Sequence, residues 1–130
     1  MTDLQNRLHI PPPSGFGPPL PFSMGVFVGN TLYLAGHIAV DPATKKVPND
    51  IESEVRILMG SVRDTLGKAG LTLQDLVYVQ VFCPDVGLFE KFNSIYRAYF
   101  QEPLPTRAFI GSGPLLFGAR FEIQGIAVKC

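Results

Sequence analysis

The C-terminal quarter of the chain contains the stretches Pro105-Thr-Arg-Ala-Phe-Ile110 and Ala119-Arg-Phe-Glu-Ile-Gln-Gly-Ile-Ala-Val128. Both are rich in Phe, Ile and Val and are bounded by Gly and Pro, a pattern typical of β-strands. Each carries a charge near its middle, Arg107 in the first and Glu122 in the second. A charge inside an apolar strand is costly to bury unless it is paired or used. These two residues are therefore the first candidates for a functional site.

Composition narrows the class of protein. The 130 residues include 11 Lys and Arg against 11 Asp and Glu, and 46% are hydrophobic, which is typical of one globular domain. Nucleic-acid binding relies on a basic surface, so the neutral charge argues against that class. No apolar run is long enough to span a bilayer. With no signal peptide, we expect Cys83 and Cys130 to be reduced thiols in a soluble, cytoplasmic protein.

The first 21 residues are rich in proline. Six of the 12 prolines fall within residues 11–21. Because proline lacks the N–H that β-ladders need and favours extended backbone, we expect residues 1–21 to form a polyproline-like arm that packs over the surface. A peptide ligand for an aromatic groove is the alternative. A single domain over residues 22–130 follows this arm.

The middle of the chain predicts a hairpin and a long helix. The Gly-Asn pair at 29–30 separates two apolar runs and favours a β-hairpin. Apolar residues recur every three or four positions over residues 51–69, with charged residues such as Glu54 mostly on the other face. This pattern predicts an amphipathic helix that Asn49 or Asp50 would cap.

The remaining elements complete an α+β pattern. Residues 76–82 are apolar at nearly every position and predict a strand buried on both faces. An aromatic stripe over residues 89–100 predicts a second helix capped by Asp85. The order strand–strand–helix–strand–helix–strand–strand predicts a mixed sheet with two helices on one face. The other face would still be apolar, which indicates self-association in a closed oligomer.

Three groups of residues carry a resemblance to a known family. They are residues 22–44, which end in Asp-Pro-Ala-Thr; Asn93 within Phe-Asn-Ser-Ile-Tyr; and Pro105-Thr-Arg107 together with Phe121-Glu-Ile123. In these groups and in element order, roughly residues 20 to 129 resemble the Rid proteins, the YjgF/YER057c/UK114 family. The resemblance implies a chorismate-mutase-like α+β subunit in a homotrimer, whose sheets face inward as a barrel with ligand clefts between subunits. Its best-known members are imine and enamine deaminases, which hydrolyse small 2-imino acids to 2-keto acids and ammonia.

The resemblance also suggests roles for individual residues. Arg107 would hold the substrate carboxylate, because a planar guanidinium can form two parallel hydrogen bonds with it. The alternative is an ion pair with Glu122. A carboxyl group such as Glu122 near an apolar wall could have a raised pKa and transfer protons to and from water and the imine nitrogen. A structural hydrogen bond is its alternative. Asn93 would orient the ligand, or would simply be an exposed helix residue.

The backbone of Gly36-His37-Ile38 is a further candidate for ligand binding. Gly36 permits close approach of a ligand or of another chain. The side chain of His37 could titrate near neutral pH, although an unpartnered histidine at a strand end is more often structural. No metal-ligand spacing is present, and hydrolysis of a preformed imine needs only water and a positioned carboxylate, so we expect neither metal nor cofactor.

The chain departs from the familiar deaminases at several positions. Phe22 and Phe109 stand where those proteins usually have Tyr and often Cys. Ala35 replaces a Ser, and His37 introduces an imidazole in place of a Gln. These changes make the expected pocket more apolar while Arg107 is kept. Deamination of a small 2-imino or enamine carboxylic acid is the leading hypothesis. A non-catalytic trimer that binds carboxylate metabolites is the alternative, and an endoribonuclease or translation inhibitor rests only on descriptions of other family members.

Overall fold

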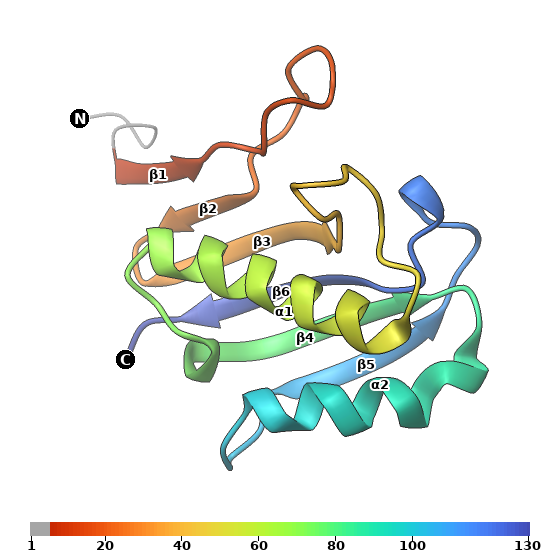
Figure 1. The fold of residues 1–130 in the computed structure, drawn as a ribbon. Coiled ribbons are helices and arrows are strands. Elements are labelled where there is room, and N and C mark those ends of the chain that lie inside the picture. The colour runs from red at the N-terminus through yellow and green to blue at the C-terminus, as the bar shows by residue number, and fades with distance from the viewer. Residues whose placement is uncertain (1–5) are drawn as a thin grey trace.

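A computed structural model describes residues 6–130 of the chain (Figure 1). Its six strands form one sheet in the order β1-β2-β3-β6-β4-β5, in which β4 and β5 are parallel and all other neighbours are antiparallel. The two α-helices lie on the same side of this sheet (Figure 1). The elements are β1 Arg7–Ile10, β2 Gly25–Val28, β3 Thr31–Ile38, α1 Ile51–Lys68, β4 Leu76–Cys83, α2 Phe89–Tyr96, β5 Thr106–Gly111 and β6 Glu122–Val128. The predicted mixed sheet with two helices on one face is confirmed.

The prediction for the N-terminal arm is wrong over Arg7–Ile10. These residues form the edge strand β1, which pairs antiparallel with β2. They contain no proline, so their N–H groups are free to complete a ladder, whereas the prolines begin at position 11. Residues 11–21 contain no helix or strand. Residues 1–5 of the predicted arm lie outside the described residues.

The hairpin and the first helix form where the sequence predicts them. Gly29 has a φ of 63° in the turn between β2 and β3, a conformation that costs glycine little. The side chain of Asp50 caps α1 by accepting a hydrogen bond from Ser53 N at 2.9 Å. The apolar face of α1 packs on the sheet, with Val55, Leu58 and Val62 fully buried.

The second helix is shorter than predicted. It ends at Tyr96, and one 3-10 turn, Arg97–Tyr99, continues it. Asp85 does not cap α2 itself, because its side chain accepts a hydrogen bond from Gly87 N in a separate 3-10 turn before the helix. The aromatic stripe nevertheless reaches the core, since Phe92 and Tyr96 are buried beneath α2.

The two faces of the sheet differ in chemistry. On β4, Val79 and Val81 are buried beneath the helices, whereas the alternate residues point to the open face. This open face was expected to be apolar, but it also carries polar groups: the amide of Gln124 on β6 donates a hydrogen bond to the amide oxygen of Gln80. The structure contains one chain, so the homotrimer stays a prediction. No helix among residues 6–130 is long and apolar enough to cross a membrane.

Candidate functional site

Arg107 lies on the edge strand β5 and points to the helix side of the sheet. Its register partner on β4 is the buried Val79, and in a parallel pair such partners share a face. The guanidinium carbon lies 4.9 Å from the centre of the Tyr96 ring and 5.6–5.9 Å from three further ring centres, those of Phe89, Phe92 and Phe109. Aromatic faces attract a cation at these distances. The aromatic rings therefore hold Arg107 in place, and no carboxylate among residues 6–130 forms an ion pair with it.

Glu122 lies on the opposite face of the same sheet. It is the first residue of β6, paired with Ile38 on one side and with Phe82 on the other, and both of these residues alternate away from the helices. Partial burial raises the pKa of the Glu122 carboxyl above its ordinary value. A carboxyl group with a raised pKa can exchange protons closer to neutral pH.

Gly36 provides the space that the Glu122 carboxylate occupies. It sits in a β-bulge between Leu34 and His37. A Cβ atom at position 36 would overlap the Oε2 atom of Glu122. The expectation that Gly36 permits a close approach therefore has a concrete basis: the group that approaches it within this chain is a candidate catalytic carboxylate.

Arg107 and Glu122 do not meet within one chain. The only ion pairs among residues 6–130 are Arg56–Glu52 and Arg120–Glu54, so Arg107 and Glu122 do not neutralise each other within one chain. Because the two side chains occupy opposite faces of the sheet, they can act on one ligand only if a second copy supplies one of them.

A pocket opens beside Arg107, between α2 and the start of β5. Its volume is ≈ 490 Å³, and Asn93, Tyr96 and Arg107 are among the residues that line it. Asn93 is half-buried rather than exposed, and its Oδ1 atom is buried without a hydrogen-bond partner. The structure thus brings together two of the predicted site residues, Asn93 and Arg107.

The two phenylalanines that were expected in the site lie in different surroundings. Phe109 is half-buried, and its ring packs edge-to-face on Phe89 with the ring centres 5.1 Å apart. It is therefore part of the wall that surrounds Arg107. Phe22 is 47% exposed in the segment before β2 and does not line the pocket beside Arg107.

The imidazole of His37 belongs to the core. It is 1% exposed, with Nδ1 lying 2.6 Å from the carbonyl oxygen of Ala35 and Nε2 lying 2.8 Å from the hydroxyl oxygen of Thr65 on α1. A neutral ring satisfies both contacts by donating from Nδ1 and accepting at Nε2. Burial lowers the pKa of His37, against a smaller opposing effect of the Ala35 hydrogen bond. The histidine is not unpartnered, and ligand binding by the Gly36-His37-Ile38 backbone stays a prediction.

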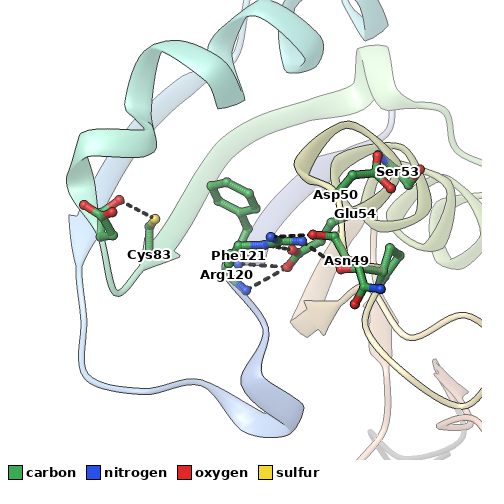
Figure 2. A network of polar contacts seen from close by, with 9 residues as sticks. Asn49, Asp50, Ser53, Glu54, Cys83, Arg120 and Phe121 are labelled. Carbon is green, nitrogen blue, oxygen red and sulfur yellow. Dashed lines mark hydrogen bonds and ion pairs between the residues drawn. The ribbon is translucent and has the colours of Figure 1, made fainter.

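An ion pair that the sequence did not predict joins Arg120 to the buried Glu54 (Figure 2). Glu54, which was expected on the solvent side of α1, is 0% exposed. Its carboxylate accepts hydrogen bonds from Arg120 Nε at 2.5 Å, from Arg120 N at 2.7 Å and from Phe121 N at 3.3 Å. The other guanidinium nitrogens donate to the carbonyl oxygens of Pro48 and Asn49. This network ties the start of α1 to the residues that lead into β6.

Comparison with known proteins agrees with this fold. The family model described as "Endoribonuclease L-PSP" matches residues 15–129. A RutC family protein of Sulfurisphaera tokodaii is 36% identical over 110 residues, covering 84% of this chain and 88% of that protein. A 2-iminobutanoate/2-iminopropanoate deaminase of Bos taurus is 33% identical, covering 84% and 80%. The crystal structure of Escherichia coli TdcF with bound serine has a TM-score of 0.81 at 29% identity and covers 94% of each chain.

The six-stranded sheet with two covering helices, and the half-buried arginine on its edge strand, define an α+β domain with a candidate anion-binding pocket. The chain belongs to the Rid (YjgF) family, the family of the L-PSP model. Relatives at about this level of identity carry the name of imine deaminase or reactive intermediate deaminase.

Proposed function

We propose that the protein hydrolyses small 2-imino or enamine carboxylic acids to 2-keto acids and ammonia. The observation that carries this proposal is Arg107, a half-buried cation that has no anionic partner within residues 6–130 and lines a pocket with Asn93. A guanidinium in such a place matches a carboxylate through two parallel hydrogen bonds. The relative named 2-iminobutanoate/2-iminopropanoate deaminase and the serine-bound TdcF structure support a small carboxylate ligand.

The reaction uses both faces of the sheet. Arg107 of one copy binds the carboxylate of the substrate, and Glu122 of a neighbouring copy in a homotrimer faces the imine carbon. Water adds its oxygen to that carbon while a proton passes to the nitrogen. The resulting carbinolamine then loses ammonia as the C=O bond forms. The raised pKa of Glu122 suits it to accept the proton from water and to return it to nitrogen.

A coupled assay tests the proposal. An imino acid generated freshly from an amino acid should give 2-keto acid faster in the presence of the protein than in buffer. Arg107→Ala should lower kcat/KM by roughly 100-fold or more, because two charge-assisted hydrogen bonds are lost. Arg56→Ala, which removes an exposed arginine of α1, is the control and should keep full activity. Full activity of Arg107→Ala would exclude the proposed carboxylate site.

Binding without turnover is the second candidate function. It is favoured by the all-aromatic wall around Arg107, in which Phe109 packs on Phe89 and offers neither thiol nor hydroxyl to a reacting group. Thermal stabilisation by a carboxylate, together with no acceleration of imine hydrolysis, would support this candidate over the deaminase.

A further inference from the structure

Two buried polar atoms make no hydrogen bond of regular geometry within residues 6–130, and the residues that carry them line the same pocket. Among the described residues, only Asn93 Oδ1 and the hydroxyl of Tyr96 are buried side-chain oxygen or nitrogen atoms without a hydrogen bond. Both residues line the pocket beside Arg107. Buried polar groups are nearly always paired, because an unpaired one loses its hydrogen bonds to water and gains nothing in return. Because both residues line one pocket, a ligand bound there could supply the missing hydrogen-bond partners.

The position of Tyr96 is fixed by its neighbours. Its side chain is 7% exposed, and its ring packs on Phe92 and Phe100 with ring centres 5.3 Å and 4.7 Å apart. The Arg107 guanidinium carbon lies 4.9 Å from the centre of the same ring. The packed ring holds its hydroxyl in place without a regular hydrogen bond to residues 6–130, which is the arrangement of a binding group that is in position before its ligand arrives.

The three groups differ in what they offer a ligand. Arg107 only donates hydrogen bonds, and the hydroxyl of Tyr96 can donate one more. Burial raises the pKa of Tyr96 to about 12, against smaller opposing effects of the Arg107 charge and of the polar contact between its guanidinium and the hydroxyl, so the phenol keeps its proton at neutral pH. That contact lacks the geometry of a regular hydrogen bond. Asn93 Oδ1 only accepts. The matching ligand carries an anionic oxygen and, close to it, an N–H group.

We propose that Tyr96 is a further binding residue, whose hydroxyl donates a hydrogen bond to the carboxylate held by Arg107 while Asn93 Oδ1 accepts from the nitrogen on the adjacent carbon. This inference rests on the proposed function and deepens it. A 2-imino or 2-amino acid satisfies all three groups. The 2-keto acid product has no N–H and leaves Asn93 Oδ1 unpaired, so the pocket discriminates against the product and favours its release.

The test uses equilibrium binding of unreactive probes to the full-length protein. Calorimetry with serine, a 2-amino acid, and with pyruvate, a 2-keto acid, should give tighter binding of serine to the wild-type chain. Tyr96→Phe should lower the affinity for both probes roughly tenfold, because both carry the carboxylate that the hydroxyl would bind. Asn93→Ala should lower the affinity for serine by a similar factor and leave the affinity for pyruvate unchanged. Tyr99→Phe is the matched control, because its ring faces Arg63 outside this pocket, and should bind both probes as the wild type does.

A thermal melt without ligand separates a binding role from a structural one. Tyr96→Phe removes a hydroxyl that makes no hydrogen bond of regular geometry with residues 6–130, so its Tm should equal or exceed that of the wild type. A lower Tm with unchanged affinity for serine would overturn the inference, and so would wild-type binding of neither probe. Weaker binding by Tyr96→Phe in a protein that shows no turnover would keep this inference and exclude the deaminase. If Tyr96→Phe binds both probes as the wild type does and Arg107→Ala is inactive, the role of Tyr96 would be excluded and the deaminase proposal kept.

Discussion

Arg107 and Arg120 are two partly buried arginines in very different surroundings. Arg120 forms an ion pair with the buried Glu54, and its remaining guanidinium nitrogens donate to two carbonyl oxygens (Figure 2). Arg107 is surrounded by aromatic rings and has no anionic partner within residues 6–130. The fold therefore supplies the ion-pair and hydrogen-bond partners of Arg120, whereas it supplies no anionic partner within residues 6–130 for Arg107.

The same contrast separates the two glutamates. Glu54 is fully buried and accepts three hydrogen bonds from Arg120 and Phe121. Glu122 is only half-buried, and its raised pKa is caused by burial without a compensating cation. A charge that the fold satisfies contributes to stability, whereas a charge that the fold holds in place but does not satisfy is available to a ligand.

The largest expected effect is the difference in free energy of unfolding between the variants that replace Arg120 and Arg107 by methionine. Arg120→Met leaves Glu54 as an uncompensated buried charge and should lower the free energy of unfolding by about 3–5 kcal/mol. Arg107→Met loses only contacts with aromatic rings and should change it by about 1 kcal/mol or less. Urea denaturation at one protein concentration measures both. Equal destabilisation by the two variants would show that the contrast is wrong.

Gly36→Ala should separate activity from stability at Glu122. The added methyl group overlaps the carboxylate, which lies at the end of a flexible side chain and can move aside. We expect a stability change of about 1 kcal/mol or less and roughly a tenfold loss of kcat/KM, a fraction of the usual contribution of acid–base catalysis. Gly60→Ala in α1, where a Cβ meets no other atom, is the control: it should stabilise the protein by about 1 kcal/mol and keep its activity. Unchanged activity of Gly36→Ala would argue against a role for the position of Glu122.

The smallest expected effect is on the pH dependence of stability and concerns His37, whose two ring nitrogens both have hydrogen-bond partners within the fold. Because its folded pKa lies below the ordinary value of 6.5, the unfolded chain takes up a proton first as the pH falls. The free energy of unfolding should therefore decrease below pH 6.5, down to the folded pKa of His37. The free energy of unfolding, measured by urea denaturation at several pH values between 7 and 5, should fall less steeply with decreasing pH for His37→Gln than for the wild type. His9→Gln, which removes an exposed ring on β1, is the control, and an equal slope in all three proteins would refute the assignment.

Local patterns predicted much of the fold. The Gly-Asn turn at 29–30, the capped helix after Asp50 and the C-terminal strands depend on neighbours in sequence, and these elements form as expected. The edge strand β1 was missed because the adjacent prolines dominated the pattern, although Arg7–Ile10 contains none of them.

The distribution of charge could not be predicted in the same way. Glu54 and Arg120 are 66 residues apart, and the helical periodicity of α1 placed Glu54 on the solvent side. Nothing in the spacing shows that the chain entering β6 covers that side of the helix. Likewise, His37 meets Thr65 only because α1 crosses β3. Arg107 and Glu122 were recognised as charges in apolar strands, but the side of the sheet that each occupies depends on strand register.

Their placement on opposite faces has a consequence for mixed populations of chains. Under the proposed function, each chain contributes Arg107 to one site and Glu122 to a different one. A chain that lacks both residues therefore inactivates two sites of its assembly, although it is only one subunit. Activity in a mixture of normal and defective chains would therefore fall more steeply than the fraction of normal chains.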